Sequence, residues 1–78
     1  MAGLGIDWFR VLMDLRYAGM SERDVAGRIG VAASTVRGWK MGSAPSHEDG
    51  ERLVMLWRAV TGKARDELPL CLGGKRRR

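Results

Sequence analysis

The sequence predicts an all-α fold, a compact bundle of four to five short helices. Two observations predict it. Apolar residues recur three and four positions apart in successive segments, and glycines separate those segments. The 78-residue chain is long enough for one small domain, which we place at residues 1–72. Residues 73–78 are expected to form a flexible basic tail.

Residues 7–18 form the first predicted helix, with Asp7 as its N-cap and Gly19 as the residue that ends it. Its apolar stripe consists of Trp8, Val11, Leu12 and Leu15. Phe9 and Met13 form a second apolar pair beside this stripe. Either a roomy core or a contact between two subunits explains that pair, and the sequence leaves both explanations open.

Two short helices joined by a tight turn are predicted over residues 21–41. Ser21 opens the first of them, with Asp24 as its partner in a capping box, and Gly30 ends it. The second helix is expected at residues 33–41. Two short helices connected in this way make a helix-turn-helix.

A fourth helix is expected between Ser46, its N-cap, and Gly62, its C-cap. Its inward stripe consists of Leu53, Leu56, Trp57 and Val60. Val54 and Met55 lie off this stripe, so we expect them to be partly exposed. Residues 63–67 are expected to form a short helical turn.

Residues 68–72 are predicted to be extended, because their leucines alternate along the chain. Pro69 excludes a central position in a sheet, since proline has no N–H to donate. The segment either packs back on its own domain or crosses to a second subunit. Cys71 is interpreted as a small buried hydrophobe.

The net charge of +5 is unevenly distributed along the chain. Residues 75–78 supply four of these charges, residues 21–41 carry a net charge of +2, and the remaining segments are nearly neutral. Binding to phosphates requires a basic patch of this kind. The charge alone fits a solvated surface with a solubilising tail equally well.

Composition argues against several classes of protein. No run of about 18 apolar residues occurs, so we expect no membrane span, and the first residues lack the pattern of a secretory signal. A single cysteine cannot form an internal disulfide, which fits a reducing cytoplasm. We expect no enzyme, no metal or other cofactor and no small-molecule ligand, because catalytic and metal-ligand motifs are missing. His47, the one histidine, is interpreted as a first-turn helix residue.

The inner residues of the predicted helix-turn-helix meet its spatial needs. Ala26 is small enough for the two helices to cross closely, and Gly30 tolerates a positive φ in the turn. Val31 fills the corner, while Val36 and Trp39 turn the apolar side of the second helix inward. All three tryptophans are expected in the core: Trp8, Trp39 and Trp57.

Through these residues the segment resembles the helix-turn-helix of the lambda repressor and Cro superfamily of phage and bacterial regulators. The matching residues are Val25, Ala26, Ile29, Gly30, Val31, Ser34, Thr35, Val36 and Trp39. Together with the flanking helices, the resemblance extends over residues 4–62. It implies a helical bundle that binds double-stranded DNA as a dimer and regulates transcription, most simply as an operator-binding repressor.

The same resemblance implies which residues contact bases. These positions fall on Ala32, Ala33, Ser34, Arg37, Gly38 and Met41. Arg37 is the strongest candidate, because arginine can bind guanine O6 and N7 through two hydrogen bonds. Many relatives begin this helix with a glutamine that pairs with adenine, whereas Ala32 and Ala33 stand here. We therefore expect specificity to depend on DNA shape or on a second subunit.

Hydroxyl and basic side chains around the motif are predicted to contact phosphates. They are Ser21, Arg23, Thr35, Lys40, Lys75, Arg76, Arg77 and Arg78. Spare apolar residues are the candidates for a homodimer contact. They are Phe9, Met13, Val54, Met55, Leu70 and Leu72. Two alternatives stay open: a protein-interaction module that has lost DNA binding, and non-specific binding driven by the basic tail.

Overall fold

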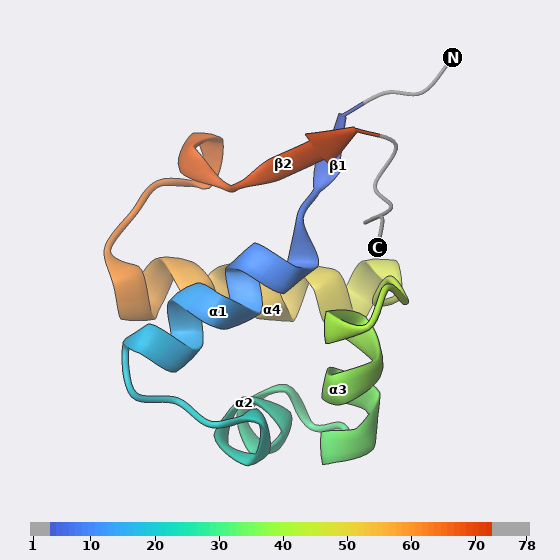
Figure 1. Ribbon diagram of the computed structural model, residues 1–78. Helices are drawn as coiled ribbons and strands as arrows, with labels where there is room; N and C mark the ends of the chain where they lie inside the picture. Colours follow the sequence, from blue (N-terminus) through green and yellow to red (C-terminus); the bar gives the residue numbers. More distant parts are fainter. Residues whose placement is uncertain (1–3, 73–78) are drawn as a thin grey trace.

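The computed structural model describes residues 4–72, which form four α-helices and a two-stranded sheet (Figure 1). The predicted all-α bundle of short helices is confirmed. Its elements in chain order are β1 (Leu4–Ile6), α1 (Trp8–Tyr17), α2 (Glu22–Ile29), α3 (Ala33–Lys40), α4 (His47–Thr61), the 3₁₀ turn η1 (Arg65–Glu67) and β2 (Leu70–Leu72). None of the described helices is long and apolar enough to cross a membrane.

The long helix α4 and the crossing helix α1 form the centre of the domain (Figure 1). Helices α2 and α3 pack on one side of this pair, and the small sheet lies on the other side. Trp57 on α4 is fully buried, and its Nε1–H donates a hydrogen bond of 2.9 Å to Asp14 Oδ2 on α1. This bond joins the two central helices and satisfies the buried indole donor.

The predicted caps begin and end the helices. Asp7 Oδ1 accepts a hydrogen bond of 3.2 Å from the Arg10 amide at the start of α1, and Ser46 Oγ accepts one of 3.2 Å from the Asp49 amide at the start of α4. Helix α4 ends at Gly62, whose φ of 75° lies in the left-handed region that glycine favours. Local polar and glycine residues therefore determine these boundaries.

The extended segment near the C-terminus packs back on its own domain. Strand β2 pairs antiparallel with β1, and Gly5 lies opposite Cys71. Pro69 precedes the strand, and its carbonyl accepts a hydrogen bond of 2.8 Å from the Asp7 amide. The sequence did not predict β1. The three residues between Gly3 and the helix cap Asp7 are too few to establish an alternating pattern.

Three predictions of burial need correction. Val54, expected to be partly exposed and available for a dimer contact, is 1% exposed. Val54 is buried because both α1 and α2 pack against α4. The buried surface of α4 is therefore wider than one apolar stripe. Trp8, expected in the core, is half-buried against Gly50, with Trp8 Cη2 3.3 Å from the place of a Cβ on that glycine. Cys71 is half-buried rather than buried.

Candidate nucleic-acid interface

Helices α2 and α3 are joined by a tight turn that Gly30 makes possible. Its φ is 94°, and the amides of Gly30 and Val31 both donate to the Ala26 carbonyl, at 2.7 and 3.0 Å. A residue with a Cβ is strained in this conformation, which explains the glycine. The turn changes the direction of the chain, so that α3 crosses α2 at a steep angle, packs against it and presents its opposite side to solvent (Figure 1).

The inner sides of these helices are buried as predicted. On α2 the buried residues are Val25, Ala26 and Ile29, and on α3 they are Val36 and Trp39. Ala26 is 4% exposed, in keeping with a helix crossing that leaves no room for a larger side chain. Because these contacts hold α3 in place, its outer side is presented by a fixed backbone.

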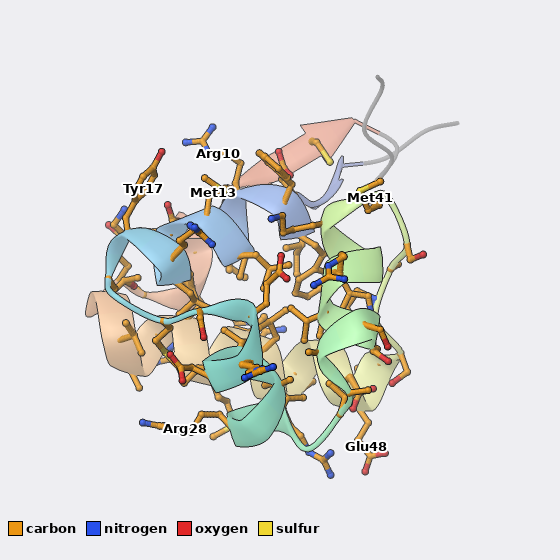
Figure 2. All side chains as sticks on the ribbon, turned by 60° about the horizontal axis from the view of Figure 1, so that its bottom comes forward. Arg10, Met13, Tyr17, Arg28, Met41 and Glu48 are labelled. Atoms are coloured by element: carbon orange, nitrogen blue, oxygen red, sulfur yellow. The ribbon has the colours of Figure 1, made fainter. Side chains whose placement is uncertain are left out.

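The outer side of α3 carries the predicted base-contacting residues with differing exposure. Ala32, Ser34, Arg37 and Met41 are exposed, and Met41 lies at the C-terminal end of the helix (Figure 2). Ala33 is half-buried against the core. Gly38 is half-buried beside the following loop, whose Ser43 amide donates a 3.0 Å bond to its carbonyl. Four of the six predicted positions are therefore openly accessible.

One carboxylate from α2 binds two cations of α3. Glu22 Oε1 lies 3.4 Å from Arg37 Nη2, and Glu22 Oε2 accepts a bond of 2.9 Å from Lys40 Nζ. The hydrogen bond from Lys40 is the main reason that the pKa of Glu22 lies below its usual value. The sequence did not reveal this network, because the partners are 15 and 18 positions apart and meet only when the helices cross.

Arginines from three helices surround a shallow hollow between the starts of α2 and α3. Its lining residues are Arg16, Ser21, Glu22, Arg23, Ala33 and Arg37. Arg16, in the last turn of α1, was missing from the predicted site. The sequence gives no sign of its role, since only the path of the chain around Gly19 brings it beside α2. Three guanidinium groups, offset in part by the Glu22 carboxylate that also lines the hollow, favour an anion there.

The helix starts beside this hollow also offer hydrogen-bond donors. Ser21 Oγ accepts a bond of 3.1 Å from the Asp24 amide, which leaves its hydroxyl proton available to another acceptor. Ala32 provides no side-chain cap for α3. The first amides of an uncapped helix suit phosphate oxygens. Thr35 and Arg23, two further predicted phosphate contacts, are exposed.

The predicted phosphate contacts also include four residues of the basic tail. Lys75, Arg76, Arg77 and Arg78 lie outside the described residues. Within residues 4–72, no three histidine, cysteine or acidic side chains gather in a way that could hold a metal ion.

The comparisons with known proteins add no relative to these observations. No model of a protein family matches the chain, and no curated protein or solved structure matches it significantly.

Proposed function

We propose that this protein is a sequence-specific double-stranded DNA-binding regulator that places α3 in the major groove. The observation that carries the proposal is the outer side of α3: small residues at its start, an exposed arginine, and three guanidinium groups around the adjoining hollow. An α-helix with its side chains is about 10–12 Å in diameter, which fits the major groove of about 12 Å.

The proposed contacts fall into two groups. Small side chains at Ala32 and Ser34 let the start of the helix approach the bases closely, and Arg37 reaches a guanine edge through two hydrogen bonds. Arg16, Arg23 and the Ser21 hydroxyl bind phosphates beside the start of the helix and fix its register. Regulation would follow from occupancy of an operator.

Two copies would bind adjacent half-sites about 34–36 Å apart on one face of the duplex. Of the predicted dimer residues, Met55 is 66% and Leu70 is 53% exposed, which leaves both available for an interface. Phe9 and Met13 are half-buried, Val54 is excluded by its burial, and the side chain of Leu72 lies outside the described part of the chain.

Selection of bound sequences from a random DNA pool, at about 0.15 M salt, tests the proposal. We expect a motif made of two inverted half-sites and a guanine whose enrichment depends on Arg37. Arg37→Gln should lose that guanine preference, because glutamine favours adenine. Arg58→Gln, at an exposed position on α4, is the matched control and should select the same motif as the wild type. A folded protein that enriches no sequence would contradict the proposal.

A protein-interaction module is the second candidate, and the ion pairs of Glu22 favour it. The carboxylate offsets part of the positive charge of α3, and Tyr17 and Met41 are each 81% exposed at the ends of neighbouring helices. Exposed aromatic and methionine side chains are common at protein interfaces. Absence of sequence enrichment from a folded protein would favour this candidate over DNA binding.

A further inference from the structure

The carboxylate of Glu22 lies closer to Lys40 than to Arg37, its two partners on α3. Lys40 Nζ lies 2.9 Å from Oε2, and the Lys40 side chain is 28% exposed. Arg37 Nη2 lies 3.4 Å from Oε1, and the Arg37 side chain is 65% exposed. The lysine is therefore bound closely and partly covered, whereas the arginine is bound loosely and stays open to solvent.

The surroundings explain why Lys40 is the more restricted partner. A small crevice beside Glu22 is lined by Leu12 and Met13 of α1, by Met20 and by Lys40. Aliphatic stems of lysines commonly cover apolar side chains in this way. With its side chain lining this crevice and its ammonium on the Glu22 carboxylate, Lys40 must break an ion pair before it can bind a phosphate.

Arg37 keeps most of its binding capacity. A guanidinium has five N–H donors, and the contact with Glu22 involves one of its terminal nitrogens. The remaining donors can bind a base edge while the contact limits the conformations of a long, exposed side chain. A side chain restricted before binding loses less entropy when it binds.

We propose that Glu22 controls both terms of DNA binding at this surface: it withholds Lys40 from phosphates, which limits affinity for any sequence, and it holds Arg37 ready for a base, which favours the right one. The inference rests on the proposed function. Non-specific affinity comes mainly from phosphate contacts, so pairing Lys40 within the protein lowers binding to the wrong sequence. Restriction of Arg37 raises binding to the right one. The restriction of Arg37 raises the ratio of specific to non-specific affinity, and the pairing of Lys40 lowers the affinity for DNA of any sequence.

Glu22→Gln tests the inference in the full chain, with two duplexes as probes: the most enriched selected sequence and a shuffled sequence of equal composition. Glu51→Gln is the matched control, since Glu51 also binds an arginine, Arg65, at 2.8 and 3.1 Å, and lies on α4. Both variants raise the net charge by one. Thermal melting by circular dichroism shows that each variant is folded.

We expect Glu22→Gln to bind the shuffled duplex about fivefold more tightly at about 0.1 M salt, with a salt slope steeper by about 0.9, as one added phosphate contact requires. The ratio of affinities for the selected and shuffled duplexes should fall about 2- to 10-fold, as loss of restriction at one side chain requires. Glu51→Gln should leave this ratio and the slope close to those of the wild type.

Lys40→Gln separates the two effects. In the wild type this substitution should change affinity for the shuffled duplex by less than about twofold, because the ammonium is already paired. In the Glu22→Gln background it should remove the whole gain. If Lys40→Gln changes the affinity for the shuffled duplex equally in both backgrounds, Glu22 does not withhold Lys40 from phosphates.

The outcomes distinguish this inference from the proposed function. A wild-type protein without preference for the selected duplex contradicts the proposed function and, with it, the role of Glu22. A wild-type preference that persists unchanged in Glu22→Gln overturns the role of Glu22 alone. Equal changes in Glu22→Gln and Glu51→Gln also overturn it, because net charge would then explain the result.

Discussion

On the inner side of α3, Val36 and Trp39 are buried against α1 and α2, whereas on the outer side Ser34, Arg37 and Met41 are exposed. The inner side is restricted by close packing with two helices, and a change there disturbs the whole core. The outer side makes few contacts within the protein. Its residues can therefore vary without loss of the fold, and binding preference can change independently of stability.

Truncation of a side chain should have a much larger effect on stability on the inner side of α3 than on its outer side. Trp39→Ala removes a side chain that is 5% exposed, and we expect a loss of about 3–5 kcal/mol in the free energy of unfolding. Met41→Ala, on the outer side, should change it by less than about 0.5 kcal/mol. Urea titration followed by circular dichroism measures both. Similar losses for the two variants would contradict the difference between the sides.

The hydrogen bond between α1 and α4 tests how much the core on which α3 packs depends on a polar contact. Asp14→Ala leaves the Trp57 Nε1–H without its acceptor, and we expect a loss of about 1–3 kcal/mol. Asp14→Asn keeps an acceptor oxygen and should recover most of that stability. Urea titration measures the free energy of unfolding of both variants. Equal values for Asp14→Ala and Asp14→Asn would show that the hydrogen bond does not cause the loss of stability.

Alanine substitutions at two glycines of residues 21–41 should change the stability of the protein in opposite directions. Gly30→Ala places a Cβ at a φ of 94° and should destabilise the protein by about 1–2 kcal/mol. Gly27→Ala, inside α2 with open space around its Cβ, should stabilise it by about 0.5–1 kcal/mol. Melting temperatures of the two variants measure this difference, and a shared sign would show that the turn does not require glycine.

The ion pairs of Glu22 should give the smallest effect, visible as a pH dependence. The hydrogen bond from Lys40 lowers the pKa of Glu22 below 4.5, its usual value, in the folded protein. The resulting stability is fully present above that unfolded value and is lost as pH falls through the lower folded pKa. Compared with Glu22→Gln, the wild type should lose about 0.2–1 kcal/mol on acidification from about pH 6 to about pH 3. An unchanged difference between the two proteins would contradict this linkage.

Sequence reasoning succeeded where the determinants are local. Ser21 and Asp24 form the expected capping box, and Gly30 and Gly62 end their helices with positive φ. Residues three or four positions apart determine these features, so one short window contains the whole pattern. The buried face of α3 was predicted for the same reason.

The remaining features depend on contacts between distant segments. Pairing of β1 with β2 joins the two ends of the described chain, and burial of Val54 follows from the number of helices around α4. Glu22 meets Lys40, and Arg16 joins the arginine hollow, only because the helices cross. Periodicity within one segment contains no information about such crossings. The prediction of the surface therefore lacked Arg16 and the ion pairs of Glu22.

Binding by the Arg37→Gln variant tests the central claim most directly. Arg37 is exposed, so its replacement should leave the free energy of unfolding within about 0.5 kcal/mol of the wild type. The affinity for the selected duplex should fall by about 1–3 kcal/mol, while that for the shuffled duplex falls much less. This result would assign base recognition to the outer side of α3. Equal affinity of the variant and the wild type for the selected duplex, with both proteins folded, would contradict the account.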